Sequence, residues 1–290
     1  MKRYLLKSCL AGFVLAVLAF LSTAPPVLNG QEVRRRPIVA APSVLPDPGG
    51  VSPADLSGLE IWLKANNSQF VSFSNNDEIT STWNDSSGNA RNATAVQRTN
   101  KKPRWIQSNG PNSYPSVLFH DVAGDGGYFT LPNFLGSFTA GDVFVVIKLA
   151  LDPPNSSDAA APGVGCWGST DDSYYPFTGD GKIYDDFGTN SRKNAIVPGV
   201  ALNAWRVVEI RTASGAWSYH IDGTQKFSTG TNTVAWGTAP KLGRSEGSAK
   251  FLRGWVAEII FYSSVLSSTD RWNTVHTYLN NKYAFSLPTS

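Results

Sequence analysis

The sequence predicts an all-β fold, a two-sheet antiparallel β-sandwich with a short helix at the C-terminus. From about residue 56, short apolar or alternating runs are separated by clusters of Gly, Asn, Asp and Pro, which is the strand-and-turn pattern of a sandwich. Charged residues make up only 16% of the chain, which contains nine tryptophans, and this balance favours half-buried strands over long helical bundles.

Six runs are predicted as strands, and one of them is predicted to be central in its sheet. The run 255–262 is apolar on both sides, with Ala257 and Ile259 expected on one face and Val256 and Ile260 on the other. The six runs are 59–64, 116–119, 142–150, 205–211, 217–221 and 255–262.

A hairpin turn and a helix are predicted in the C-terminal part of the chain. Asp222 and Gly223 lie between two alternating runs and predict a tight hairpin turn. Further on, Ser267 or Ser268 can cap a helix whose apolar residues recur at helical spacing. These residues predict a buried stripe that packs on the sandwich: Trp272, Val275, Leu279 and Tyr283.

The first 30 residues predict an export signal. Lys2, Arg3 and Lys7 precede an apolar run over residues 10–21, which is the order of a secretory signal peptide. The run is shorter than the roughly 20 apolar residues that a spanning helix needs, and an uncleaved N-terminal anchor stays open as the alternative. We therefore expect an exported protein, which is secreted, periplasmic or at the cell surface, with membrane contact only through this segment.

The rest of the chain divides into a spacer and one domain. Residues 31–55 contain five prolines and hardly any aromatic residues, so we expect an extended, Pro-rich spacer. Residues 56–285 are predicted to fold as one domain. Cys9 falls in the signal peptide, which leaves Cys166 without an intramolecular disulfide partner, and we expect Cys166 to be a small buried side chain.

Several phrases in this domain, in their order and spacing, resemble the concanavalin A-like lectin/glucanase superfamily, in particular the laminin-G-like domains of bacterial exported proteins. The resemblance implies a jelly-roll sandwich, often a glycan-recognition role, and sometimes a calcium ion. It implies no activity, because one fold hosts many functions. The phrases lie at residues 59–65, 83–89, 115–119, 175–188, 219–223, 254–262 and 278–283.

No catalytic residues are predicted. The glucanases of this superfamily carry a Glu-x-Asp-x-x-Glu pattern that supplies the two carboxyl groups of glycoside hydrolysis, and the sequence lacks it. Glu258 is a strand carboxylate that stands alone. The three histidines, His120, His220 and His276, suggest no triad by their spacing. A net charge of +3 gives little support for a nucleic-acid partner.

The most suggestive stretch for ligand binding runs from residue 167 to residue 190. It mixes aromatic side chains with carboxylates and amides, which stack on sugar rings and bond hydroxyl groups. The predicted carbohydrate-binding residues are Asp171, Tyr174, Asp185 and Asn190. We expect Asp171, Tyr174 and Asp185 to be exposed, and Tyr175, Phe177 and Tyr184 to pack inward.

Calcium is the one cofactor left open. Asp121 and Asp125 place two carboxylates on a glycine-rich loop, and calcium binds such oxygen ligands. The alternative is that these aspartates are solvated turn residues, a common use of Asp.

The sequence thus predicts a secreted, noncatalytic, lectin-like domain that binds extracellular or cell-surface glycan. The alternative is a structural or protein-binding module of the cell envelope, whose partner is an envelope protein. The third possibility is a glycan-cleaving enzyme.

Overall fold

The computed structural model describes residues 45–98, 101–119, 127–152, 167–170, 173–177, 179–245 and 251–289, which all belong to one compact unit. The predicted signal peptide, Asp121, Asp125, Cys166 and Asp171 lie outside the described residues. Within these ranges, no helix is long and apolar enough to cross a membrane.

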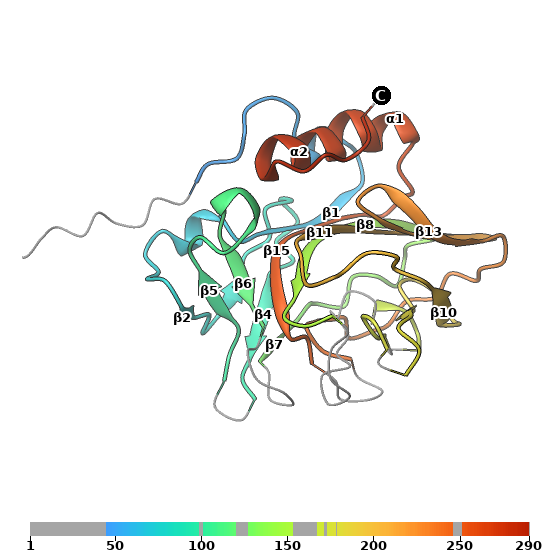
Figure 1. Cartoon of the computed structure of the whole chain (residues 1–290), viewed down its shortest axis with the longest axis horizontal. Coiled ribbons are helices and arrows are strands. Elements are labelled where there is room, and N and C mark those ends of the chain that lie inside the picture. The colour runs from blue at the N-terminus through green and yellow to red at the C-terminus, as the bar shows by residue number, and fades with distance from the viewer. Residues whose placement is uncertain are drawn as a thin grey trace, which may run out of the picture. The chain divides into compact units, whose positions relative to one another are not determined.

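The fold is an antiparallel β-sandwich with one helical segment at its C-terminal end (Figure 1). The large sheet has the order β13-β12-β11-β8-β15-β6-β5-β2, with β1 also paired to β15, and the second sheet has the order β14-β7-β4-β3. A separate pair joins β9 to β10. The strands are β1 (Leu59–Lys64), β2 (Asp77–Glu78), β3 (Thr82–Trp83), β4 (Ala93–Val96), β5 (Arg104–Ile106), β6 (Ser116–Leu118), β7 (Tyr128–Thr130), β8 (Ala140–Leu149), β9 (Ile183–Asp185), β10 (Lys193–Ile196), β11 (Arg206–Ala213), β12 (Ala216–Ile221), β13 (Thr224–Thr229), β14 (Lys241–Leu242) and β15 (Gly254–Tyr262).

All six predicted strands are present, and the hairpin turn is confirmed. Asp222 and Gly223 connect β12 to β13 with φ angles of 50° and 73°, as a tight hairpin with two left-handed residues requires. The strand β15 is central, because it pairs with β8, β6 and β1.

The expected alternation along β15 is wrong at its start. Its register to β8 shifts between Val256 and Glu258, which is the mark of a β-bulge. Because the bulge inserts one residue, Val256 packs in the same core as Ile259, whereas Ala257 packs with Ile260 on the opposite face.

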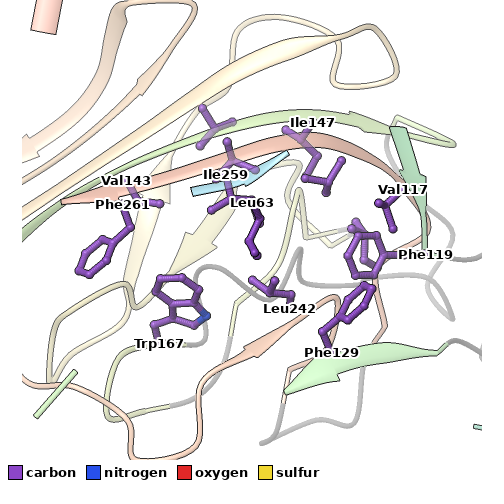
Figure 2. Close-up of a cluster of buried hydrophobic side chains, with 14 of the residues drawn as sticks. Leu63, Val117, Phe119, Phe129, Val143, Ile147, Trp167, Leu242, Ile259 and Phe261 are labelled. Carbon is purple, nitrogen blue, oxygen red and sulfur yellow. The ribbon is translucent and has the colours of Figure 1, made fainter. Parts of the chain in front are cut away.

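The main core lies between the large sheet and the layer formed by the second sheet and the loops (Figure 2). Strand β8 illustrates the two-residue period of a strand, because Val143, Val145 and Ile147 face this core. Phe144 and Val146 face the other way. Figure 2 shows the large-sheet side chains meeting residues from the opposite layer: Phe129, Trp167 and Leu242.

The outer face of the large sheet is covered by the C-terminal helical segment (Figure 1). The segment consists of α1 (Ser268–Asp270), a π-helical turn (Arg271–His276) and α2 (Thr277–Tyr283). Ser267 is its cap, and the Ser267 hydroxyl accepts a hydrogen bond of 3.0 Å from the Asp270 N–H. The segment packs on Phe144, Val146 and other outward residues of the sheet.

The predicted stripe on this helix is correct for Val275, Leu279 and Tyr283 and wrong for Trp272, which is only half-buried. The cause is the π turn, in which the Thr277 N–H reaches the carbonyl of Trp272 five residues back. The prediction assumed 3.6 residues per turn throughout, whereas a π turn is wider.

Part of the predicted spacer is docked on the domain. We call residues 45–55 the strap. The Tyr114 hydroxyl donates to the Pro46 carbonyl and the Tyr262 hydroxyl donates to the Pro53 carbonyl, each at 2.8 Å. Asp47 forms an ion pair of 2.7 Å with the buried Lys282. Residues 45–55 of the predicted spacer thus contact the domain, because polar side chains of the domain bind their backbone and Asp47.

Candidate functional site

Three half-exposed aromatic rings form the candidate site, and we call Tyr174, Phe177 and Tyr184 the aromatic platform. Backbone hydrogen bonds of 2.8 and 2.9 Å join Tyr174 and Tyr184 in both directions, and the Phe177 N–H donates to Lys182 at 2.7 Å. Directly opposed residues of an antiparallel pair project to the same side. The ring centroids are accordingly 5.2 Å (Tyr174–Phe177), 5.8 Å (Tyr174–Tyr184) and 5.2 Å (Phe177–Tyr184) apart.

Charged groups border the platform. The guanidinium carbon of Arg192 lies 4.9 Å from the ring centroid of Tyr184 and 5.4 Å from that of Tyr174. The Tyr184 hydroxyl donates to Asp180 at 3.1 Å, and Lys182 lies 3.5 Å from the same carboxylate. The Lys182 N–H, which donates to Asp180 at 2.9 Å, is the main cause that lowers the pKa of Asp180 below its ordinary value.

The sequence-predicted residues separate into two groups here. Tyr174 belongs to the platform, and Asn190 is exposed nearby in the chain, where its N–H donates to the Thr233 carbonyl at 3.2 Å. Asp185 was expected to be exposed, and this is wrong, because its side chain is fully buried. Along β9 the side chains alternate, so that Tyr184 faces out and Asp185 faces in.

Asp185 is held inside by specific hydrogen bonds. The Tyr175 hydroxyl donates to one carboxylate oxygen, and the Phe187 N–H donates to the other at 2.8 Å. Burial raises the pKa of Asp185 to about 7, although both hydrogen bonds act in the opposite direction. Asp185 thus supports the loop from inside and does not meet a ligand at the surface.

The expectation that Phe177 and Tyr184 pack inward is also wrong, whereas Tyr175 is buried as expected. A signal in the sequence identifies the two missed residues. Asp180 and Gly181 form a turn, and Gly181 has a φ of 69°. Positions on the two sides of such a turn oppose one another, which places Phe177 and Tyr184 on the side of Tyr174.

The platform suits contact with a sugar. Aromatic faces provide flat apolar area, while the carboxylate of Asp180 beside Tyr184 accepts hydrogen bonds from hydroxyl groups. Among the residues that the structure describes, no group of three or more His, Cys, Asp or Glu side chains is placed to hold a metal ion.

A hollow lies between the strap and the chain near β1. This hollow measures about 580 Å³ and is lined largely by polar residues. Much of its polar wall is already engaged within the protein: Asn67 donates to Ser86 at 3.0 Å, and Asp85 accepts the Trp62 N–H at 2.8 Å. These polar groups are therefore used in contacts within the domain.

No family model matches the sequence, and no curated protein matches it. Among solved structures, the chain is similar to the binding domain of Paraclostridial Mosquitocidal Protein 1, with a TM-score of 0.51 and 11% identity over 79% of this chain and 54% of that chain. It is also similar to domain 4 of AbnA, a GH43 extracellular arabinanase from Geobacillus stearothermophilus, in complex with arabinotriose, with a TM-score of 0.45 and 16% identity over 66% of this chain and 95% of that chain.

A third similar structure is the sialidase of Trypanosoma rangeli, with a TM-score of 0.44 and 13% identity over 79% of this chain and 33% of that chain. The chain thus spans about half of the toxin domain and a third of the sialidase. At these identities the likeness bears on the fold alone, and the toxin domain supports the β-sandwich.

Proposed function

We propose that the chain is an exported, noncatalytic, lectin-like protein whose aromatic platform binds glycan. The observation that carries the proposal is the gathering of Tyr174, Phe177 and Tyr184 on one surface, with Asp180 and Arg192 at its border. The resemblance of the sequence to laminin-G-like domains supports the same ligand class.

The exposure of the three rings is the physical reason. Leaving a large aromatic side chain half in water forgoes part of the free energy of burial, which is about 25 cal/mol per Å² of apolar surface. Three such rings, with centroids 5.2 to 5.8 Å apart, gather partly exposed aromatic surface in one place, and exposed apolar surface of this kind supports a binding role. The polar groups at the border can fix the orientation of a bound sugar through hydrogen bonds.

Binding without turnover is the second part of the proposal. Glycoside hydrolysis needs two carboxyl groups separated by roughly 5 to 9.5 Å across the scissile bond. Asp180 stands at the platform with a lowered pKa, which keeps it ionised and unsuited to donate a proton. Asp185 has a pKa of about 7, a value suited to a general acid, but it is fully buried and bonded to Tyr175.

The proposal is tested by glycan binding of platform variants. Tyr174→Ala and Tyr184→Ala should each weaken binding roughly three- to tenfold, because an aromatic contact contributes about 0.5–1.5 kcal/mol. The melting temperature should change little, since half-exposed side chains contribute little to stability. The matched control is Trp272→Ala, which removes a half-buried aromatic ring from the C-terminal helix.

A glycan array with and without calcium identifies the ligand for these measurements and tests the loop of Asp121 and Asp125 as a calcium site. Loss of binding without calcium supports that site, and unchanged binding opposes it. A folded wild-type chain that binds no glycan, or platform variants with unchanged affinity, would overturn the proposal in favour of the envelope protein-binding module. Release of reducing sugar would favour the enzyme.

A further inference from the structure

A second surface cluster joins two arginines to two aromatic rings at one end of the smaller sheet. We call Arg98, Arg244, Tyr128 and Phe251 the arginine patch. Arg98 follows β4, whose Val96 pairs with Tyr128 of β7. Arg244 follows β14, which also pairs with β7, and forms an isolated bridge to Phe251. The topology of one sheet thus brings the four residues together.

The side chains of the patch contact one another closely. The guanidinium carbon of Arg98 lies 4.1 Å from the ring centroid of Phe251, and that of Arg244 lies 5.7 Å from the same centroid. Arg244 also lies 5.0 Å from the Tyr128 centroid and donates to the Tyr128 hydroxyl at 3.0 Å. Phe251 is buried beneath, whereas both arginines are half-exposed. Two positive charges therefore share one ring at the surface.

Most other arginines of the domain face an acidic group. Arg206 lies 2.9 Å from Asp222, and Arg271 lies 3.1 Å from Glu209. Arg91 forms an ion pair with Glu60. By contrast, within the described part of the chain no carboxylate lies within 4.0 Å of Arg98 or Arg244.

Lys101 adds a third cation to the same surface. Its backbone is joined to that of Arg98 by hydrogen bonds of 2.9 and 2.7 Å, and its side chain is half-exposed. Like charges held together at a surface repel, and a bound anion removes that cost. The local charge thus favours a ligand that carries several negative groups.

We propose that the arginine patch binds an acidic polysaccharide, that is, a glycan with carboxylate or sulfate groups. A contact between a guanidinium and a ring leaves most N–H donors of the arginine available, and these donors match carboxylate and sulfate oxygens in pairs. The ligand class rests on the proposed function of the chain. The arginine patch and the aromatic platform share no residue.

The test compares four probes on the full chain: polygalacturonate, dextran sulfate, neutral dextran and a short DNA duplex. The wild type should bind an acidic polysaccharide with an affinity that falls as salt is added, because added ions screen exposed charges. Of the two acidic probes, the tighter one identifies carboxylate or sulfate as the preferred group. Neutral dextran should not compete.

The variant Arg98→Gln/Arg244→Gln should weaken binding of the acidic probe by about tenfold or more, because Gln lacks both the positive charge and the paired N–H donors of the guanidinium. The affinity of Arg98→Lys/Arg244→Lys should lie between those of the wild type and the double Gln variant, because Lys keeps the positive charge and loses the paired N–H donors. Arg104→Gln is the matched control, because Arg104 forms a surface ion pair of 3.6 Å with Glu78. The affinity of this variant for the acidic probe should stay within about twofold of the wild-type value.

Two further outcomes decide the proposal. Tyr184→Ala should retain acidic-polysaccharide binding, so failure of the platform and failure of the arginine patch are distinguishable. Binding of neither acidic probe, an unchanged affinity of the double Gln variant, or equally tight binding of DNA would overturn the proposal. Near-UV circular dichroism of each variant shows that the fold is intact when affinity is lost.

Discussion

Single residues of β9 show how strand geometry divides chemistry between surface and interior. Tyr184 and Asp185 are adjacent in sequence, yet Tyr184 belongs to the aromatic platform while Asp185 is fully buried. The sequence predicts the reverse arrangement, with Asp185 exposed and Tyr184 packed inward, because composition does not indicate on which face of a strand a side chain lies. Their difference follows from the pairing of Tyr184 with Tyr174, which fixes the face on which each side chain lies.

The buried Asp185 predicts a specific pH dependence of stability. Its pKa is about 7 in the folded state, against an ordinary value near 3.9 when unfolded. Between these values the folded state binds more protons, so this group makes stability fall as pH rises from about 4 to 7, by up to about 1.4 kcal/mol per pH unit. Asp185→Asn should remove this slope, because an amide does not ionise.

Urea unfolding of wild type and variant at pH 4.5, 6 and 8 measures the effect. As pH rises, the free energy of unfolding of Asp185→Asn should increase relative to that of the wild type. Asp180→Asn is the control, because Asp180 is exposed and its pKa is lowered. Parallel pH profiles for wild type and Asp185→Asn would show that Asp185 is ionised in the folded state.

At the scale of elements, the C-terminal helical segment is fixed by a buried polar network as well as by apolar contacts. Glu258 on β15 is fully buried and accepts hydrogen bonds from Lys282 at 2.8 Å, Tyr278 at 2.9 Å and Tyr283 at 2.7 Å. The Trp62 indole N–H donates to the same carboxylate. In the sequence Glu258 only interrupts an apolar strand, and its partners lie in other elements, so no local pattern indicates its role.

Removing one member of this network should be costly. Lys282→Met leaves the Glu258 carboxylate buried without its counter-charge. Such a change should lower the free energy of unfolding by about 3–5 kcal/mol. The double variant Lys282→Met/Glu258→Gln should lose less stability than the sum of the losses of the two single variants, because it contains no unpaired buried charge.

Chemical denaturation measures these losses, with Trp272→Ala as the control in the same helical segment. Because Trp272 is half-buried, its removal should cost less than the about 3–5 kcal/mol of a core aromatic residue. A loss below about 1 kcal/mol for Lys282→Met would contradict the network as the fixing contact of the helix.

For the whole molecule, the parts predicted from sequence are those that depend on periodicity. Six of the strands, the turn at Asp222 and the helix start at Ser267 follow from local patterns, and the structure confirms them. The bulge at Val256 and the π turn at Trp272 change that periodicity by one residue. The hydrophobic pattern of the sequence indicates neither of them. The sequence therefore predicts the layers better than the facing of individual side chains.

The residues of the two candidate sites come from segments that are far apart in the sequence or joined by a turn, and the pairing of strands brings them together. The sequence indicates the stretch around Tyr174, but the full platform requires the pairing of Tyr174 with Tyr184. The arginine patch joins Arg98 to Phe251, which lie far apart in the chain, through the pairing of β4, β7 and β14. Long-range pairing of this kind is a property of the fold and has no local pattern.

The most direct test of glycan recognition by the platform is a nuclear magnetic resonance titration of the chain with a neutral glycan selected on the array. We predict that the amide signals that shift belong to residues 173–193, and that the spectrum of the sugar shows no new anomeric signals after prolonged incubation. Shifts centred on the hollow near Asn67 and Ser86, or the appearance of new reducing ends, would contradict it.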